Sequence, residues 1–189
     1  SADLSRMLET IAGHAVEGIH VARVSVWLLS PDRRALVCAA LVGPAGPLPP
    51  VPEPINVSDH PAYFAAIETE RFISVLDAQT DPRTQSFAKP YLIPLGITSM
   101  LDGPIRIEGH VVGSLCVEHI GRPRVWTEGE THLASAMADM ASVALQTSRR
   151  AGAERELDRR TRLLQNLAKL SRARFWRSRV RRSSSRLLQ

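Results

Sequence analysis

The chain has 189 residues, and its 44% hydrophobic content is sufficient for one domain with a sizeable buried core. Seven arginines and no acidic residue lie in residues 172–189, which leaves 17 basic and 19 acidic side chains elsewhere. The domain therefore lacks the basic surface that is typical of nucleic-acid binding. No apolar run is long enough to span a membrane, and no signal-peptide pattern opens the chain.

The two cysteines, Cys38 and Cys116, are far apart and belong to no paired motif. This usage argues against a zinc site and is typical of the reducing cytoplasm, where we expect the protein to reside. A disulfide between the two stays open. Ser1 in place of an initiator methionine indicates a fragment of a longer protein.

The N-terminal third predicts a helix followed by a β-hairpin. Apolar residues recur at helical spacing from Leu4 to Ile19. Residues 23–30 (RVSVWLLS) and 35–42 predict two strands around a turn at Pro31-Asp32-Arg33. Residues 43–54 contain six prolines and predict an extended, exposed loop, with binding to a proline-recognising domain as the alternative.

The middle of the chain predicts short elements. A helix begins at Asp59-His60-Pro61, and residues 72–76 (FISVL) form a short strand. Residues 77–87 read as a loop. Residues 88–95 predict a short helix that is shaped by two prolines and ended by Gly96.

The strongest strand signal is a hairpin of residues 97–107 and 111–120, joined at Glu108-Gly109. If Ile107 faces His110, then Leu101 pairs with Cys116 and Ser99 pairs with Glu118. This register places on one face Ile97, Ser99, Leu101, Ser114, Cys116 and Glu118, and on the other Met100, Asp102, Gly113, Leu115, Val117 and His119. Gly113, in mid-strand, indicates a bulge or a close backbone approach.

After the hairpin, Thr127 and Glu130 form a capping-box pattern that opens a long helix. A weak three-four alternation of residues continues to residue 171. It predicts a parallel two-stranded signalling helix, with a single amphipathic tail helix as the alternative. Residues 172–189 predict a disordered end or part of a linker, with binding to nucleic acid or an acidic membrane as the alternative.

Three segments carry a family resemblance: YLIPLGITSMLDGPI, GHVVGSLCVEHIG, and the W-T-x-x-E that opens the last helix. From about Leu4 to Gln146 the chain resembles the GAF domain. It looks closest to the GAF modules of bacterial sensor histidine kinases and diguanylate cyclases, and more distantly similar to phytochrome chromophore domains. The resemblance implies an α+β fold whose antiparallel sheet carries the terminal helices on one face and a roofed ligand pocket on the other. We expect a GAF domain over residues 1–148, an exit helix over 149–171 and a basic tail over 172–189.

The resemblance also implies a ligand-binding site. Alignment with the phytochrome relatives puts six residues on the pocket face of the sheet: Ser25, Trp27, Ser99, Leu101, Cys116 and Glu118. Strand parity from the predicted hairpin register agrees for the last four. The roof would come from Tyr63, Phe64, Asp77, Asp81, Arg83 and Phe87. The alternative is that these side chains only fill a core.

The ligand and any cofactor stay unidentified at this stage. No cysteine lies between Pro44 and Met100, so the covalent bilin attachment of some relatives is excluded there. The signature of cyclic-nucleotide GAF domains is not visible. Haem ligation by His60, His119 or His132 is conceivable. Alternation separates His119 from Cys116 and Glu118, which argues against one metal ion held by all three.

The resemblance predicts a sensory module and no enzyme, because the cysteine set of the free methionine sulfoxide reductases, which share the fold, is missing. A small ligand would signal through the last helix to a kinase or cyclase outside this chain. We expect a homodimer through residues 4–19 and 127–170. A ligand-free dimerisation platform and the sensing part of a transcription regulator are the alternatives.

Overall fold

The computed structural model describes residues 2–51 and 53–184, with side chains up to residue 167. It divides into two units, residues 1–146 and 147–189. The helices are α1 (Ala2–Ile19), η1 (Val57–Asp59), α2 (Pro61–Thr69), η2 (Gln85–Phe87), η3 (Ala88–Leu92), α3 (Ile93–Leu95) and α4 (Glu128–Ser184). The strands are β1 (Arg23–Leu29), β2 (Ala35–Gly43), β3 (Gly46–Pro47), β4 (Ile55–Asn56), β5 (Ile73–Val75), β6 (Ile97–Ile107) and β7 (His110–Ile120).

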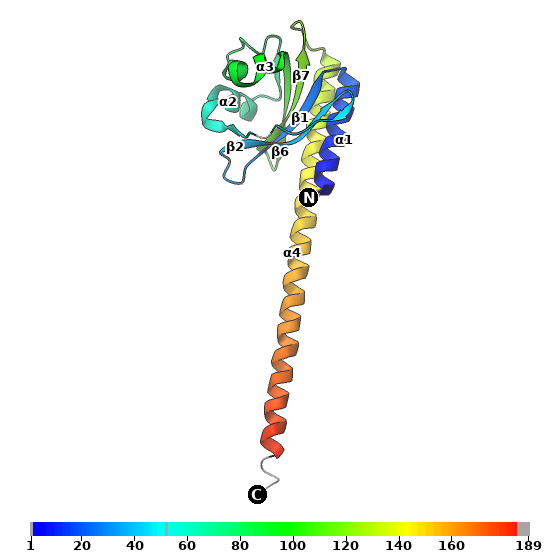
Figure 1. Cartoon of the computed structure of the whole chain (residues 1–189), viewed down its shortest axis with the longest axis vertical. Coiled ribbons are helices and arrows are strands. Elements are labelled where there is room, and N and C mark those ends of the chain that lie inside the picture. The colour runs from blue at the N-terminus through cyan, green and yellow to red at the C-terminus, as the bar shows by residue number, and fades with distance from the viewer. Residues whose placement is uncertain (1, 52, 185–189) are drawn as a thin grey trace. The chain divides into compact units, whose positions relative to one another are not determined.

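The strands form one antiparallel sheet in the order β3-β2-β1-β7-β6-β5, and β4 pairs with β2. Figure 1 shows α1 and the start of α4 side by side on one face of the sheet, with α2 and α3 on the other. This arrangement confirms the predicted α+β class. In the described part of the proline-rich segment, Gly43 ends β2, and Gly46 and Pro47 form the two-residue strand β3 at the sheet edge, where a missing N–H is tolerated.

Alternating side chains of the strands divide the interior into two cores. On the helix face, Val24 and Val26 of β1 and Leu115 of β7 pack against the apolar stripes of α1 and α4. On the opposite face, a second core gathers under α2, η2 and η3 and includes Trp27, Tyr63, Ile67, Phe87, Leu92, Met100 and Cys116. The candidate site lies in this second core.

The predicted hairpin register is wrong by one residue, because of a β-bulge near the turn. Ile107 does pair with His110 and Arg106 with Val111, but Ile105 then pairs with Gly113, so Val112 is the extra residue. Beyond the bulge, the observed partners are Asp102 with Cys116, Leu101 with Val117, Met100 with Glu118, and Ser99 with His119. Met100 and Asp102 therefore share a face with Cys116 and Glu118, while Leu101 belongs to the helix-side core.

Gly113 occupies the close backbone approach that its position in mid-strand predicts. A Cβ at this residue would lie 2.2 Å from the backbone oxygen of Trp27. We expect Gly113→Ala to lower the free energy of unfolding by about 3 kcal/mol or more, because β1 and β7 would have to separate.

Urea denaturation of the Gly113→Ala variant measures this loss. Gly129 offers a matched control at the start of α4, where an added Cβ meets no atom within 4 Å. Gly129→Ala should be neutral or slightly stabilising, through helix propensity. A Gly113→Ala variant as stable as the wild type would contradict the tight approach of β1 to β7.

The capping box at the start of α4 is confirmed. The Glu130 amide donates to Thr127 Oγ1 at 3.2 Å, and the Thr127 amide donates to Glu130 Oε2 at 2.8 Å. The helix continues to Ser184, past its predicted end at residue 171, and residues 185–189 of the predicted tail lie outside the described residues. In the second unit, Leu157 and Leu164 of the predicted seam are exposed, and their pairing in a dimer stays a prediction. Among the described residues, no helix is long and apolar enough to cross a membrane.

Candidate functional site

A small cavity lies between the sheet and its roof. Its volume is about 20 Å³, room for roughly one water molecule. Five of the predicted site residues line it: Trp27, Tyr63, Phe87, Cys116 and Glu118. Ser25 is fully buried directly beside it, where its Oγ accepts a hydrogen bond of 2.9 Å from Trp27 Nε1. The structure brings these six residues together around the cavity, and their binding of a ligand stays a prediction.

Two of the predicted sheet residues lie elsewhere. Leu101 packs in the helix-side core, because the Val112 bulge reverses its side. Ser99 Oγ donates to the Leu76 carbonyl at 2.6 Å and accepts from the Arg124 amide at 2.9 Å. Ser99 therefore ties the segment before α4 to the sheet.

Of the predicted roof residues, four do not line the cavity. Phe64 packs with its edge against Tyr63, at 5.5 Å between ring centroids. Asp77 Oδ1 accepts from the Gln79 amide in a turn. Asp81 and Glu70 both pair with Arg83, at 2.9 Å each, in a partly exposed network. These contacts shape the loop that covers the sheet.

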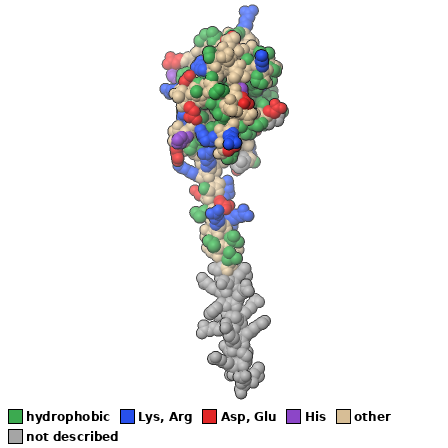
Figure 2. Space-filling view, turned by 90° about the vertical axis from the view of Figure 1, so that its left-hand side faces the viewer, with side chains coloured by type: hydrophobic (Ala, Val, Ile, Leu, Met, Phe, Trp, Pro, Cys, Tyr) green, Lys and Arg blue, Asp and Glu red, His purple; other side chains and the backbone are tan. Residues whose placement is uncertain are grey.

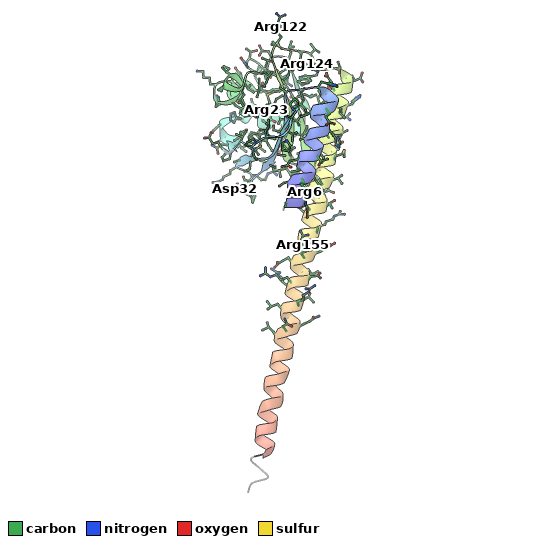
Figure 3. All side chains as sticks on the ribbon, turned by 45° about the vertical axis from the view of Figure 1, so that its right-hand side comes forward. Arg6, Arg23, Asp32, Arg122, Arg124 and Arg155 are labelled. Carbon is green, nitrogen blue, oxygen red and sulfur yellow. The ribbon has the colours of Figure 1, made fainter. Side chains whose placement is uncertain are left out.

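The structure adds a buried ion pair that the sequence analysis missed. Arg23 and Glu118 are direct cross-strand partners on β1 and β7, and Arg23 Nε lies 2.5 Å from Glu118 Oε2. Only 8% of Arg23 and 1% of Glu118 is exposed. Arg23 is labelled in Figure 3. Burial raises the pKa of Glu118, and the nearby guanidinium opposes that rise. Strand parity with Ser25 and Trp27 is the signal that places Arg23 on this face.

Tyr91, also missed, completes this group from the roof element η3. Its hydroxyl donates to Glu118 Oε1 at 2.8 Å and accepts from Arg23 Nη2 at 2.8 Å. Burial raises the pKa of Tyr91, so the phenol stays protonated. Nothing in the sequence distinguishes Tyr91 from a core aromatic, because it lies in a proline-shaped segment without regular periodicity.

A second polar group surrounds Asp102, which is fully buried. Tyr63 donates to Asp102 Oδ2 at 2.7 Å, and the same hydroxyl lies 3.3 Å from Ser114 Oγ. Asp102 Oδ1 has no hydrogen-bond partner among the described residues. Burial raises the pKa of Asp102 to about 7, against the lowering effect of the Tyr63 hydrogen bond.

Cys116 is not a reactive thiol in this environment. Its Sγ donates to Ser114 Oγ at 3.4 Å and is enclosed on the pocket face. Burial, with Asp102 nearby, raises its pKa well above the ordinary value, so the nucleophilic thiolate is disfavoured. Among the described residues, no three His, Cys, Asp or Glu side chains converge to hold a metal ion.

An open cleft of about 370 Å³ lies outside the small cavity. It runs between the proline-rich loop, at Val51 and Glu53, and the roof, at His60 and Pro90. Its lining shares four residues with the inner cavity: Trp27, Ile55, Phe87 and Tyr91. These side chains are the wall between the two spaces. Figure 2 shows this side of the domain, where hydrophobic and charged side chains of both signs are interspersed.

The comparisons place this fold among known proteins. The family model that describes the GAF domain matches residues 3–145. The GAF domain of Thermosynechococcus elongatus PixJ, in its blue-light absorbing form, is similar at a TM-score of 0.67 and 21% identity, over 83% of this chain and 92% of that one. A fragment of a methyl-accepting chemotaxis protein, residues 122 to 287, is similar at a TM-score of 0.65 and 20% identity, over 78% of this chain and 91% of that one.

The free methionine-R-sulfoxide reductase from Neisseria meningitidis, solved in complex with its substrate, gives a TM-score of 0.62 at 17% identity, over 80% of this chain and 83% of that one. No curated protein matches the chain. At these identities the structural likeness shows the fold alone. The family match covers most of the chain, which therefore belongs to the GAF domain family, the sensory and regulatory modules of signalling proteins.

Proposed function

We propose that this domain binds a small organic molecule between the sheet and its roof and signals through α4 to an output domain outside this chain. The observation that carries the proposal is the wall of four side chains between the inner cavity and the outer cleft. A rotation of these side chains would join the two spaces into a pocket of ordinary ligand size, which is roughly 300–1,000 Å³. Apolar walls with a few convergent polar groups are typical of small-molecule sites.

The polar groups at the base of the cavity support binding rather than catalysis. Arg23, Glu118 and Asp102 are buried and mostly paired with each other or with tyrosines. The thiol nearest to them, Cys116, is not an activated nucleophile, because burial raises its pKa and keeps it protonated. GAF domains are usually non-catalytic, and this site fits that role.

The route from the pocket to the helix runs through β6. Asp102 accepts a hydrogen bond from Tyr63, which lines the inner cavity, and the next residue, Gly103, faces α4. A Cβ at residue 103 would lie 2.9 Å from Ala138 Cβ and 3.4 Å from the Ala134 carbonyl oxygen. Because packed interiors leave no free space at such a contact, a displacement of β6 would move α4 with it.

The downstream half of the proposal concerns parts outside this structure. We propose a cytoplasmic signalling protein in which a sensor histidine kinase or diguanylate cyclase receives the signal, from a homodimer formed along α1 and α4. The exposed apolar residues Met140, Leu157 and Leu164 support this dimer, because each needs a partner surface to be buried. The small volume of the inner cavity, about 20 Å³, favours a second function, a dimerisation platform that binds no ligand.

Native mass spectrometry of freshly purified protein, beside the same sample denatured, tests these functions. Sensing predicts a mass increment that is lost on denaturation, and a visible absorption spectrum tells a pigment or haem from a colourless metabolite. A dimer without any retained or added ligand would favour the platform. A monomer at micromolar concentration would contradict signalling through paired helices.

A further inference from the structure

We propose that the Tyr91 side chain occupies the position of the ligand, and that the ligand is a small neutral phenol. This inference rests on the proposed ligand-binding function and names the chemical class of the ligand. Tyr91 would act as a tethered stand-in that the ligand replaces when the roof opens.

The hydroxyl of Tyr91 shows which polar group the site accepts. It bridges two opposed partners, donating to Glu118 Oε1 and accepting from Arg23 Nη2, both at 2.8 Å. Any replacement must offer a donor and an acceptor at one point, because an unpaired buried polar atom is costly. A single hydroxyl group meets both requirements.

Charge balance excludes ionic ligands at this position. Arg23 and Glu118 already neutralise each other at 2.5 Å in a buried site. A carboxylate ligand would need Arg23 released from Glu118, and an ammonium ligand would need Glu118 released from Arg23. Either separation leaves one buried charge without its original partner, at a large desolvation cost. The described lining of the outer cleft includes no lysine or arginine, and burial lowers the pKa of His60, which keeps that ring neutral. The charged side chains of this lining are the carboxylates Glu53 and Asp59, so the cleft offers no counterion to an anionic ligand.

The surroundings of the Tyr91 ring select a flat aromatic molecule. Trp27 meets the ring edge to face, with centroids 6.4 Å apart at 77°. The Arg23 guanidinium carbon lies 5.6 Å from the ring centroid. Such contacts favour an aromatic ring over an aliphatic alcohol of the same size.

The element that carries Tyr91 is suited to withdraw it. η3 is a five-residue π-helical turn, followed by the three-residue α3, and the two contain Pro90 and Pro94. π-helical turns are rare and occur often at functional sites. The segment is anchored on one side only, because Ala88 and Leu92 of η3 are buried in the second core while Ile93 of α3 is 56% exposed. Because Tyr91 lines both spaces, its withdrawal would connect the inner cavity to the cleft.

Chemical complementation tests the inference. Tyr91→Ala should leave a phenol-sized hole, and p-cresol, which is the tyrosine side chain itself, should refill it. We expect p-cresol to raise the melting temperature of this variant in a saturable way and to bind about tenfold more tightly than toluene, because its hydroxyl meets charged partners. Wild-type protein should bind p-cresol more weakly than the variant, since Tyr91 competes for the position.

Two variants act as controls. Phe64→Ala removes an aromatic ring that borders Tyr63 but lines neither space, so it should show no preference for p-cresol. The triple variant Tyr91→Ala/Arg23→Met/Glu118→Met should bind p-cresol and toluene equally. If far-UV circular dichroism shows that Tyr91→Ala is unfolded, Tyr91→Val with phenol and benzene replaces it. Equal affinity of the two compounds for the folded variant, or none for either, would overturn the inference.

Native mass spectrometry separates this inference from the proposed function. Two results together would support the phenol site and count against sensing: Tyr91→Ala prefers p-cresol over toluene, and the wild type carries no ligand of any kind. A charged ligand retained by the wild type, with no p-cresol preference in the variant, would overturn the phenol site and leave sensing supported.

Discussion

Replacing Arg23 by methionine is expected to lower the free energy of unfolding by about 3–5 kcal/mol. The change leaves the Glu118 carboxylate buried without its counterion, and removing one partner of a buried pair is strongly destabilising. Without the guanidinium, the already raised pKa of Glu118 should rise further. The variant should therefore lose more stability at pH 8 than at pH 5, where Glu118 can take up a proton.

Urea denaturation at both pH values measures this effect. Arg6→Met is the matched control, because Arg6, labelled in Figure 3, pairs with Asp3 on the surface and 76% of its side chain is exposed. This control should change the free energy of unfolding by less than about 1 kcal/mol. The double variant Arg23→Met/Glu118→Met should regain most of the loss, since apolar replacement of a buried pair is often neutral. An Arg23→Met variant no less stable than Arg6→Met would contradict a buried, charged Glu118.

Asp102→Asn is expected to stabilise the domain at pH 8 by on the order of 4 kcal/mol relative to the wild type. The pKa of Asp102 is raised to about 7 in the folded domain, mainly by burial, against a reference value of 3.8. Below about pH 4 the carboxyl is protonated in both states and contributes nothing. Between about pH 4 and 7 unfolding releases its proton, so stability falls as pH rises, and above pH 7 the full cost is present.

The measurement is the difference in unfolding free energy between Asp102→Asn and the wild type from pH 4 to 8. The amide keeps an acceptor for the Tyr63 hydroxyl but cannot ionise. The difference should grow with pH and level off above 7. Asp139→Asn, at an exposed position on α4, removes one carboxyl outside this buried site and is the matched control. A flat curve for Asp102→Asn would show that Asp102 is not held in a dry site.

Local signals in the sequence predict most of the helices and strands, and the family resemblance predicts how they are arranged. The turn at Glu108-Gly109, the capping box at Thr127 and the terminator Gly96 each occupy the place that their chemistry predicts. Residues 88–95 were predicted as one short helix and instead form η3 and α3, because Pro90 and Pro94 interrupt regular hydrogen bonding. The end of α4 was missed because charged sequences lack a clear stop signal.

The site was harder to predict for two physical reasons. Alternation along a strand assigns side chains to the two faces of a sheet only when the register is continuous. A prediction that omits the Val112 bulge therefore assigns Ser99 and Leu101 to the wrong face. Tertiary contacts also decide which aromatics matter. Tyr91 is distinguished from Phe64 only by the charged pair that it meets across the domain.

The bulge at Val112 has a consequence for how this chain can change over evolutionary time. A substitution at that residue alters one side chain, and its deletion would only remove the bulge, because Val111 and Gly113 already lie on opposite faces and would keep their partners Arg106 and Ile105. A deletion between Gly113 and Glu118, by contrast, would turn Glu118 away from Arg23 and into the apolar layer under α1. Related sequences are therefore expected to vary in length at residue 112 and in the proline-rich loop, and to conserve the length of β7 between Gly113 and Glu118.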